Sequence, residues 1–364
     1  MAKPRKSRQD PKVREFILRN VRERPDSIVA LTVKEFGLTR ATIHRYVVRL
    51  QKDGLLTAHG KTRARRYTLK PLASETFTIK VFAGLPEHHI WTLRALPHLE
   101  GTPENILGIC KYGFTEMLNN VVDHSATTKC LIGIRRNYAD VEFLIRDFGI
   151  GIFKKIQHDF GLADVREALL ELSKGKLTSD KTRHSGEGIY FTSRMFDRFQ
   201  IASGSLLYEK NRQEDDEWLI ETGDRNAPSD GTRVYLRVST DIKWTIQDIF
   251  EKYAGDGLGF RRTHVPVKLG LYPDDELVSR SQAKRILARF ENFSEVLLDF
   301  DGVSHIGQPF ADEIFRVFKL DHPNIEVMAV RSNLKVRKMI EYVITSGELL
   351  DRQAELPLPP PPHH

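Results

Sequence analysis

The chain has 364 residues, of which 40% are hydrophobic, so it is long enough for two or three domains with cores of their own. Its two cysteines, Cys110 and Cys130, form no CxxC pair, which argues against a disulfide framework or a cysteine zinc site and favours a reducing cytoplasm. No apolar run approaches the roughly 20 residues of a membrane span, and no apolar segment follows the basic N-terminus as in a secretory signal.

The net charge of +7 is distributed unevenly along the chain. Residues 1–70 hold 19 Lys and Arg against 6 Asp and Glu, whereas the remaining residues hold 37 against 43. Because residues 1–70 are basic and the rest of the chain is acidic, we expect residues 1–70 to bind a polyanion such as nucleic acid. The alternative is a charged surface that only faces solvent.

The first 70 residues predict a disordered basic arm over 1–9 and a small domain over 10–70. Asp10 can cap a helix whose first turn contains Pro11. Gly37 and Thr39 are typical of the end of one helix and the cap of the next. Helices are therefore expected from Pro11, over 28–36 and after Thr39 as far as Asp53, and strands over 55–58 and 66–69.

Three helices followed by a basic hairpin resemble a winged helix-turn-helix, and residues 38–56, LTRATIHRYVVRLQKDGLL, resemble many bacterial regulators over their whole length. The resemblance implies that the third helix enters the major groove of double-stranded DNA. The residues offered to DNA would be Arg40, Thr42, His44, Arg45 and Arg49 on the helix, and Lys61, Arg63, Arg65 and Arg66 on the hairpin. The alternative is a winged helix that serves only as a protein-interaction module.

A helix is expected over residues 106–124, and it carries Glu116, Asn120 and His124 on one face because they are four residues apart. Polar residues on an inner face are costly unless they have partners. A magnesium–nucleotide complex would provide them, since Asn offers a neutral oxygen to a hard cation and Glu can act as a base. The alternative is a solvated polar stripe.

Two glycine motifs follow this helix. Asp147-Phe-Gly-Ile-Gly151 comes directly after a strand expected over 141–147, where a carboxylate can accept a hydrogen bond from an amino group and glycines allow a close backbone approach. Gly186-Glu-Gly188 begins a further helix, whose free N–H groups can hold phosphate. Each motif alone is also compatible with an ordinary turn.

Together, in this order and spacing, the motifs resemble the Bergerat-fold (GHKL) ATPases over residues 105–240; that family includes gyrase, histidine kinases, MutL proteins and anti-sigma-factor kinases. The resemblance implies a domain over 71–255 that binds ATP and Mg²⁺, with an ATP lid over 152–185. By the same resemblance Glu116 is the catalytic residue and Asn120 the magnesium ligand. The nucleotide-binding residues it implies are Asn120, Asp123, His124, Asp147, Gly149, Gly151, Gly186, Gly188 and Thr232.

His98 lies in a segment, Pro97 to Pro103, that is similar to the phosphoacceptor box of histidine kinases. Gly101 and the flanking prolines are unsuitable for the helix which that box requires. The chain is therefore not expected to be a complete histidine kinase.

Residues 262–350 are similar to STAS domains, and more closely to the STAS-like DUF4325 domains, through residues 279–285 and 310–316. Strands are expected over 295–300 and 325–330, and helices over 310–318 and 334–343. In anti-sigma-factor antagonists, the STAS domain has a phosphorylatable serine at the start of the helix after the central strand. Here Gln308 and Pro309 lie near that position and Ser304 lies earlier, which argues against phosphorylation there. Residues 351–364 are proline-rich, and we expect them to be a disordered tail.

The expected fold class is thus α+β and multidomain: a winged helix-turn-helix, a Bergerat α/β sandwich and a small STAS-like α/β domain. The function expected first is a cytoplasmic regulator of transcription that binds ATP, Mg²⁺ and double-stranded DNA, and that couples ATP binding or hydrolysis to DNA binding. A Ser/Thr protein kinase working by partner switching is the alternative, and an ATP sensor without turnover is a third option. A protein partner of the STAS-like domain and a homodimer are compatible with each of these functions, whereas a membrane partner is not expected.

Overall fold

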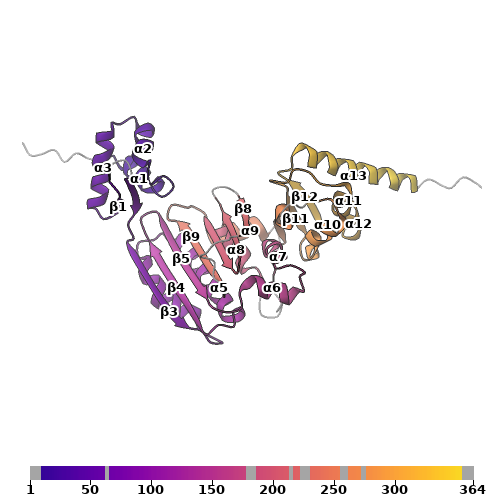
Figure 1. The fold of residues 1–364 in the computed structure, drawn as a ribbon, viewed down its shortest axis with the longest axis horizontal. Coiled ribbons are helices and arrows are strands. Elements are labelled where there is room, and N and C mark those ends of the chain that lie inside the picture. The colour runs from indigo at the N-terminus through magenta and orange to yellow at the C-terminus, as the bar shows by residue number, and fades with distance from the viewer. Residues whose placement is uncertain are drawn as a thin grey trace, which may run out of the picture. The chain divides into compact units, whose positions relative to one another are not determined.

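The computed structural model describes residues 10–61, 65–177, 186–212, 216–221, 230–254, 261–271 and 276–354. It contains helices and sheets throughout, which confirms the expected mixture of α and β structure (Figure 1). The chain divides into two compact units. The first comprises residues 1–149, 195–201 and 231–245, and the second comprises residues 150–194, 202–230 and 246–364.

The first unit begins with three helices and a hairpin, as the sequence predicts. They are α1 (Pro11–Asn20), α2 (Ile28–Phe36), α3 (Arg40–Lys52), β1 (Leu56–His59) and β2 (Arg66–Leu69). The Asp10 carboxylate accepts the N–H of Lys12 at 2.9 Å and caps α1. Thr39 caps α3 by accepting the N–H of Thr42 at 3.2 Å. Gly37 ends α2 in the left-handed conformation that glycine allows.

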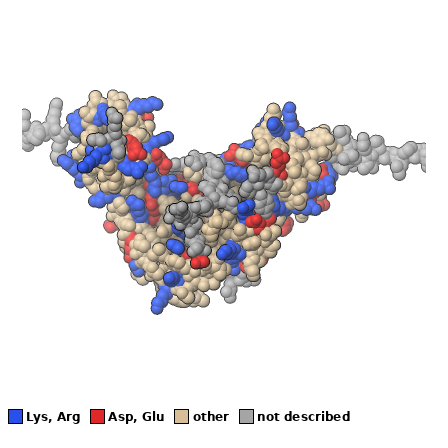
Figure 2. Space-filling model, in the orientation of Figure 1, with Lys and Arg blue, Asp and Glu red and all other residues tan. Residues whose placement is uncertain are grey.

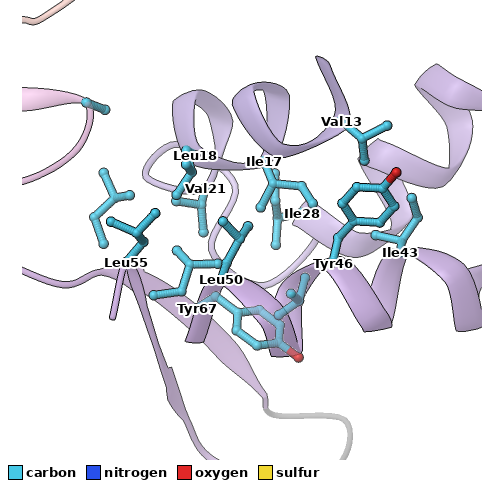
Figure 3. Packing of buried hydrophobic residues seen from close by; sticks show 14 residues of the cluster. Val13, Ile17, Leu18, Val21, Ile28, Ile43, Tyr46, Leu50, Leu55 and Tyr67 are labelled. Carbon is cyan, nitrogen blue, oxygen red and sulfur yellow. The ribbon is translucent and has the colours of Figure 1, made fainter. Parts of the chain in front are cut away.

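These elements share one hydrophobic core, in which the labelled side chains point toward one another between the helices and the hairpin (Figure 3). Val13, Ile17 and Leu18 come from α1, and Ile43 and Leu50 come from α3. The cluster also includes Ala139, with Tyr138 packed against it, from the turn between β4 and β5 of the following sheet. The N-terminal elements are therefore packed onto the rest of the first unit.

Four strands of the first unit are consecutive antiparallel neighbours in the order β3-β4-β5-β9. Their bounds are β3 (Ala73–Lys80), β4 (Lys129–Arg136), β5 (Asp140–Asp147) and β9 (Arg233–Ser239), and β6 (Arg198–Ser203) follows β9 in the sheet order. Strand β3, which was not predicted individually, pairs with β4 along its whole length. Most side chains of β3 are polar, which suits a strand at the edge of a sheet.

Helix α5 (Glu104–His124) packs against β5 and β9 through its apolar face. Phe114 on this face lies 5.6 Å, centroid to centroid, from Phe143 of β5 and from Trp91. Trp91 belongs to a short helical stretch made of α4 (Glu87–Ile90), a π-helical turn (Trp91–Ala95) and a 3-10 turn (Leu96–Leu99). His98 lies in that 3-10 turn and places its Nε2 2.9 Å from Glu75.

The second unit contains two helices within the segment that was expected to be a long polar lid, namely α6 (Ile152–Phe160) and α7 (Glu167–Lys174). Its other elements before residue 255 are α8 (Gly188–Met195), the antiparallel pair β7 (Leu206–Asn211) and β8 (Asp216–Glu221), and α9 (Ile246–Ala254).

The remainder of the second unit is a small parallel α/β layer in the strand order β10-β11-β12. Its elements are β10 (Arg262–Pro266), a 3-10 turn (Val267–Gly270), α10 (Arg280–Leu287), a 3-10 turn (Phe290–Asn292), β11 (Glu295–Asp299), α11 (Gln308–Asp312), a π-helical turn (Glu313–Val317), α12 (Phe318–Asp321), β12 (Glu326–Val330) and α13 (Leu334–Ala354). Ser279 and Gln282 form a reciprocal capping box at the start of α10. Helix α13 includes residues 351–354, so the expectation that the disordered tail begins at residue 351 is wrong. The helix continues because no proline occurs before Pro357.

No helix among the described residues combines the length and the apolar character that crossing a membrane would need. The expected basic arm over 1–9 and the end of the expected tail, 355–364, lie outside the described residues.

Candidate functional site

Asp147 is the last residue of β5, and its side chain is buried, with 3% of its surface exposed. Its Oδ1 accepts the backbone N–H of Gly149 at 2.9 Å. Thr232, which precedes β9, donates both its backbone N–H and its hydroxyl to the same carboxylate, and its carbonyl accepts the N–H of Asp147 at 3.0 Å. The structure therefore brings together two predicted site residues that are far apart in the sequence.

Burial raises the pKa of Asp147, because a charged carboxylate loses hydration, while the donors from Gly149 and Thr232 act in the opposite direction. Cys130, opposite Asp147 on β4, is fully buried, and its burial, with the nearby Asp147 charge, raises the pKa of its thiol to about 12. Cys130 is thus a packing residue and not a nucleophile.

Gly149 and Gly231 allow three chain segments to meet around Asp147. A Cβ atom at Gly149 would lie 1.7 Å from the carbonyl oxygen of Ser125, at the end of α5. A Cβ atom at Gly231, where φ is +76°, would lie 2.3 Å from the carbonyl oxygen of Asp147. Neither position tolerates a side chain without a backbone shift, so both glycines are needed to assemble this corner of the unit.

Helix α5 carries the other predicted residues of the first unit. Glu116, Asn120 and His124 are half-buried on one face, and Asp123 is exposed. Within the described residues, the only polar contact of the Asn120 side chain is a long one, from Nδ2 to the Met117 Sδ at 4.0 Å. Its amide oxygen is therefore available to a ligand.

The donor set of the first unit suits a magnesium nucleotide. Asn120 supplies a neutral oxygen and Glu116 lies one helical turn before it, which are hard oxygen donors of the kind that Mg²⁺ prefers. Asp147 supplies a buried acceptor at the end of a strand. These residues fit the magnesium–nucleotide complex that is expected from the sequence.

The remaining predicted glycines belong to the second unit. Gly151, with φ +84°, precedes the first residue of α6, and Gly188 is the first residue of α8. Gly186, with φ +70°, passes so close to the segment after α7 that a Cβ atom there would lie 2.6 Å from the backbone nitrogen of Leu177. Residues 178–185, the end of the expected ATP lid, lie outside the described residues.

The predicted recognition helix α3 exposes Arg40, His44, Arg45 and Arg49. Thr42 is half-buried, and its hydroxyl lies 3.0 Å from that of Thr39 and accepts from Arg45 at 3.2 Å, so it supports the helix start. Helices α1 to α3 and the β1–β2 hairpin are called the N-terminal module below. Figure 2 shows Lys and Arg side chains gathered over it, at the left of the view. The outer face of α3 is therefore basic and accessible within the first unit.

The residues of the hairpin that are predicted to contact DNA differ in their exposure. Lys61 and Arg66 are exposed, and Arg66 forms a solvent-facing ion pair with Asp26 at 3.4 Å. Arg65 is half-buried over the ring of Tyr67, and its buried Nε has no partner among the described residues. Arg63 lies outside the described residues.

Arg19 of α1 and Arg22, just after it, have a role that sequence reasoning missed. Arg22 places Nη1 2.7 Å from Asp140 and Nη2 2.7 Å from Glu142, both on β5. Arg19 donates to the hydroxyl of Thr240 at 2.9 Å, just after β9. Both arginines belong to the basic residues over 1–70 that were expected to face a polyanion. The alternating acids at the start of β5 were the signal that could have indicated an internal partner.

A cavity of about 620 Å³ lies between the hairpin and β4–β5. Its lining includes Arg22, His59, Arg66 and Glu142. Three of these side chains have partners: Arg22 pairs with Glu142, Arg66 pairs with Asp26, and His59 hydrogen-bonds to Thr68 at 3.0 Å. We therefore interpret the cavity as a gap left where the hairpin packs on the sheet.

The comparisons with known proteins identify one part of the chain. Residues 282–342, from α10 into α13, match the family described as the STAS-like domain of unknown function (DUF4325). The search of curated proteins gives no match. The C-terminal layer thus contains a STAS-like domain, as its sequence predicts.

Proposed function

We propose that this protein is a DNA-binding regulator whose hold on DNA is controlled by ATP and Mg²⁺. The observation that carries the proposal is the antiparallel pair β5–β9. At one end of this pair are Asp147 and Thr232, two of the predicted nucleotide-binding residues. At the other end Arg22 pairs with Asp140, and Arg19 bonds to Thr240, so that α1 is attached there.

The proposed nucleotide site assigns a task to each residue. Asp147 accepts a hydrogen bond from the exocyclic amine of adenine, and Thr232 orients that carboxylate. Asn120 offers its amide oxygen to Mg²⁺, which supplies charge neutralisation for the phosphates when bound. Glu116 accepts a proton from the attacking water. The glycine turn at Gly186 and Gly188 donates backbone N–H groups to phosphate.

The proposed DNA site is the exposed face of α3, where Arg40, His44 and Arg45 face outward. Arginine in the major groove can bind guanine through two parallel hydrogen bonds, and the remaining cations bind phosphates. Arg14 and Arg49 both pair with Asp53, at 2.6 and 3.5 Å, so this carboxylate moderates the charge at the far end of α3. DNA binding through this surface must weaken with added salt.

The proposed coupling follows from the attachment of α1. Because Arg22 pairs with β5 and the core cluster includes Ala139, the N-terminal module cannot move without breaking buried contacts to the strands that hold Asp147. A change of strand position on nucleotide binding is therefore transmitted to the module that carries α3. Only a differential affinity of ATP for two such states would shift DNA binding.

A second candidate function is a Ser/Thr protein kinase, which the STAS-like match at residues 282–342 favours. In that case Glu116 would activate a protein hydroxyl in place of water. The domain itself offers the exposed Ser304, whose Oγ lies 3.0 Å from Nδ1 of His305.

The fate of the γ-phosphate separates the two candidates. We would incubate the full chain with γ-labelled Mg-ATP, with and without double-stranded DNA, beside the Glu116→Ala variant. Release of free phosphate that is lost in the variant supports the regulator, and label on protein supports the kinase. If the variant released phosphate as fast as the wild type, the role given to Glu116 would be wrong.

A further inference from the structure

A buried lysine, Lys174, joins the C-terminal end of helix α7 to the STAS-like domain. The side chain of Lys174 is completely buried, and its Nζ lies 2.5 Å from Oε1 of Glu171 in the same helix. The same ammonium donates to the carbonyls of Ala288 at 2.9 Å and Arg285 at 3.3 Å. These carbonyls lie at the C-terminal end of α10, where a helix leaves its last C=O groups without partners and favours a positive charge.

Arg289 of the STAS-like domain completes this cluster. Its Nη1 donates to Oε2 of Glu171 at 2.8 Å, so the Glu171 carboxylate bridges Arg289 and Lys174. Its Nη2 donates to the carbonyl of Gly175 at 3.2 Å and also to that of Lys176. A single guanidinium therefore holds both the helix and the backbone that follows it.

Two further bonds fix the same segment. The hydroxyl of Thr263, on β10, donates to the carbonyl of Lys174 at 2.7 Å. In the other direction, Nζ of Lys176 donates to the carbonyl of Asn292 at 2.7 Å. The backbone over 174–176 is thus held from several sides by side chains and carbonyls between residues 263 and 292.

This segment in turn shapes the turn at Gly186. The N–H of Leu177 donates to the carbonyl of Gly186 at 3.0 Å. A Cβ atom at Gly186 would lie 2.6 Å from the Leu177 nitrogen and 2.7 Å from the Lys176 carbonyl carbon. The path of the glycine turn therefore depends on where residues 176 and 177 are held.

We propose that Arg289 is a positioning residue for the phosphate-binding turn at Gly186, through which the STAS-like domain controls the affinity of the protein for a nucleoside triphosphate. The inference rests on the proposed nucleotide function. Arg289 touches no nucleotide in this account; it acts through the backbone of residues 175–177. A partner that displaced the STAS-like domain from α7 would release the turn and weaken triphosphate binding.

The test compares nucleotides that share adenine but differ in phosphate. We would measure Kd values of the full chain for Mg-ATP and for AMP by calorimetry, in the wild type and in Arg289→Ala. The matched control is Arg280→Ala, an exposed arginine of the same domain that pairs with Asp312 at 3.4 Å. Arg289→Ala is expected to weaken Mg-ATP binding at least tenfold and AMP binding less than twofold, and the control is expected to change neither.

Three results would overturn the inference, and they are distinguishable. Equal weakening of ATP and AMP in Arg289→Ala would show a general loss of structure, and unchanged ATP affinity would show that the turn does not depend on Arg289. A wild type that binds no adenine nucleotide would overturn the proposed function together with this inference. If Arg289→Ala does not fold by circular dichroism, Thr263→Val replaces it, with a smaller ATP-specific loss expected and an unchanged ATP affinity contradicting the inference.

Discussion

Thr232 donates its hydroxyl and its backbone N–H to the buried carboxylate of Asp147, and this pair joins the end of β5 to the start of β9. Burying a carboxylate is costly because it loses hydration, and the hydrogen bonds from Gly149 and Thr232 offset only part of that cost. In the proposed function this buried carboxylate is the acceptor for the exocyclic amine of adenine.

The first prediction concerns this acceptor. Asp147→Asn keeps the size of the side chain and leaves one oxygen for Gly149 and Thr232, but removes the charge that strengthens a bond to adenine. We expect the Kd for Mg-ATP to rise about tenfold or more, since a charge-assisted hydrogen bond is roughly twice as strong as a neutral one. Calorimetry checks this, and Asp301→Asn, an exposed change, serves as the control. Unchanged affinity in Asp147→Asn would remove Asp147 from the site.

The same residue predicts a pH effect on the protein without nucleotide. Burial raises the pKa of Asp147 above its ordinary value of 3.8, so the folded state binds its proton more tightly than the unfolded state does. Between pH 3.8 and the raised pKa, the contribution of Asp147 to the free energy of unfolding therefore falls as the pH rises. Asp147→Asn should therefore raise the Tm of the nucleotide-free protein at pH 7, and this gain should shrink toward pH 4. Thermal unfolding over that range checks it, and a lower Tm at pH 7 would contradict it.

A third prediction concerns α3. Arg45 is exposed and has no carboxylate partner among the described residues, so it is free to bind a DNA phosphate or base. Arg45→Ala should reduce the slope of log K against log salt by about one, because one contact and its released counterion are lost. Lys34→Ala, on the exposed face of α2, should leave the slope unchanged. Equal slopes for Arg45→Ala and the wild type would move the DNA surface elsewhere.

A fourth prediction tests the link between the N-terminal module and the sheet. Arg22→Met leaves Asp140 and Glu142, whose side chains are 9% and 12% exposed, without their shared cation. Because Arg22 is itself about one-third exposed, we expect a loss of about 1–3 kcal/mol in the free energy of unfolding. Urea denaturation measures it. Arg14→Met removes a more exposed ion pair and should cost less than about 1 kcal/mol.

Much of the fold could be predicted from local sequence. Asp10, Gly37 and Thr39 indicate helix boundaries because capping and left-handed backbone depend on single residues. Strand β3 could not be predicted, since an edge strand with mostly polar side chains lacks a clear apolar pattern. The helices of the expected lid were missed although Phe153 and Ile156 of α6, and Leu169 and Leu172 of α7, have helical spacing and are buried.

The candidate site was predictable only in part. Asp147 and Gly149 stand in a recognisable motif, and the structure places Thr232 beside them, while their role in nucleotide binding stays a prediction. Lys174 was not predictable, because a lysine before a glycine at the end of a helix is usually solvated. Its burial depends on carbonyls more than a hundred residues later in the chain.

The central claim is that nucleotide binding changes DNA binding, and one measurement tests it directly. We would measure the affinity of the full chain for a double-stranded DNA library by fluorescence anisotropy, at fixed salt, with and without saturating Mg-ATP. We expect a change of at least fivefold in the wild type, about 1 kcal/mol of coupling, and a smaller change in Asp147→Asn at the same Mg-ATP concentration. DNA affinity that is the same with and without Mg-ATP, in a protein shown to bind both, would contradict the account.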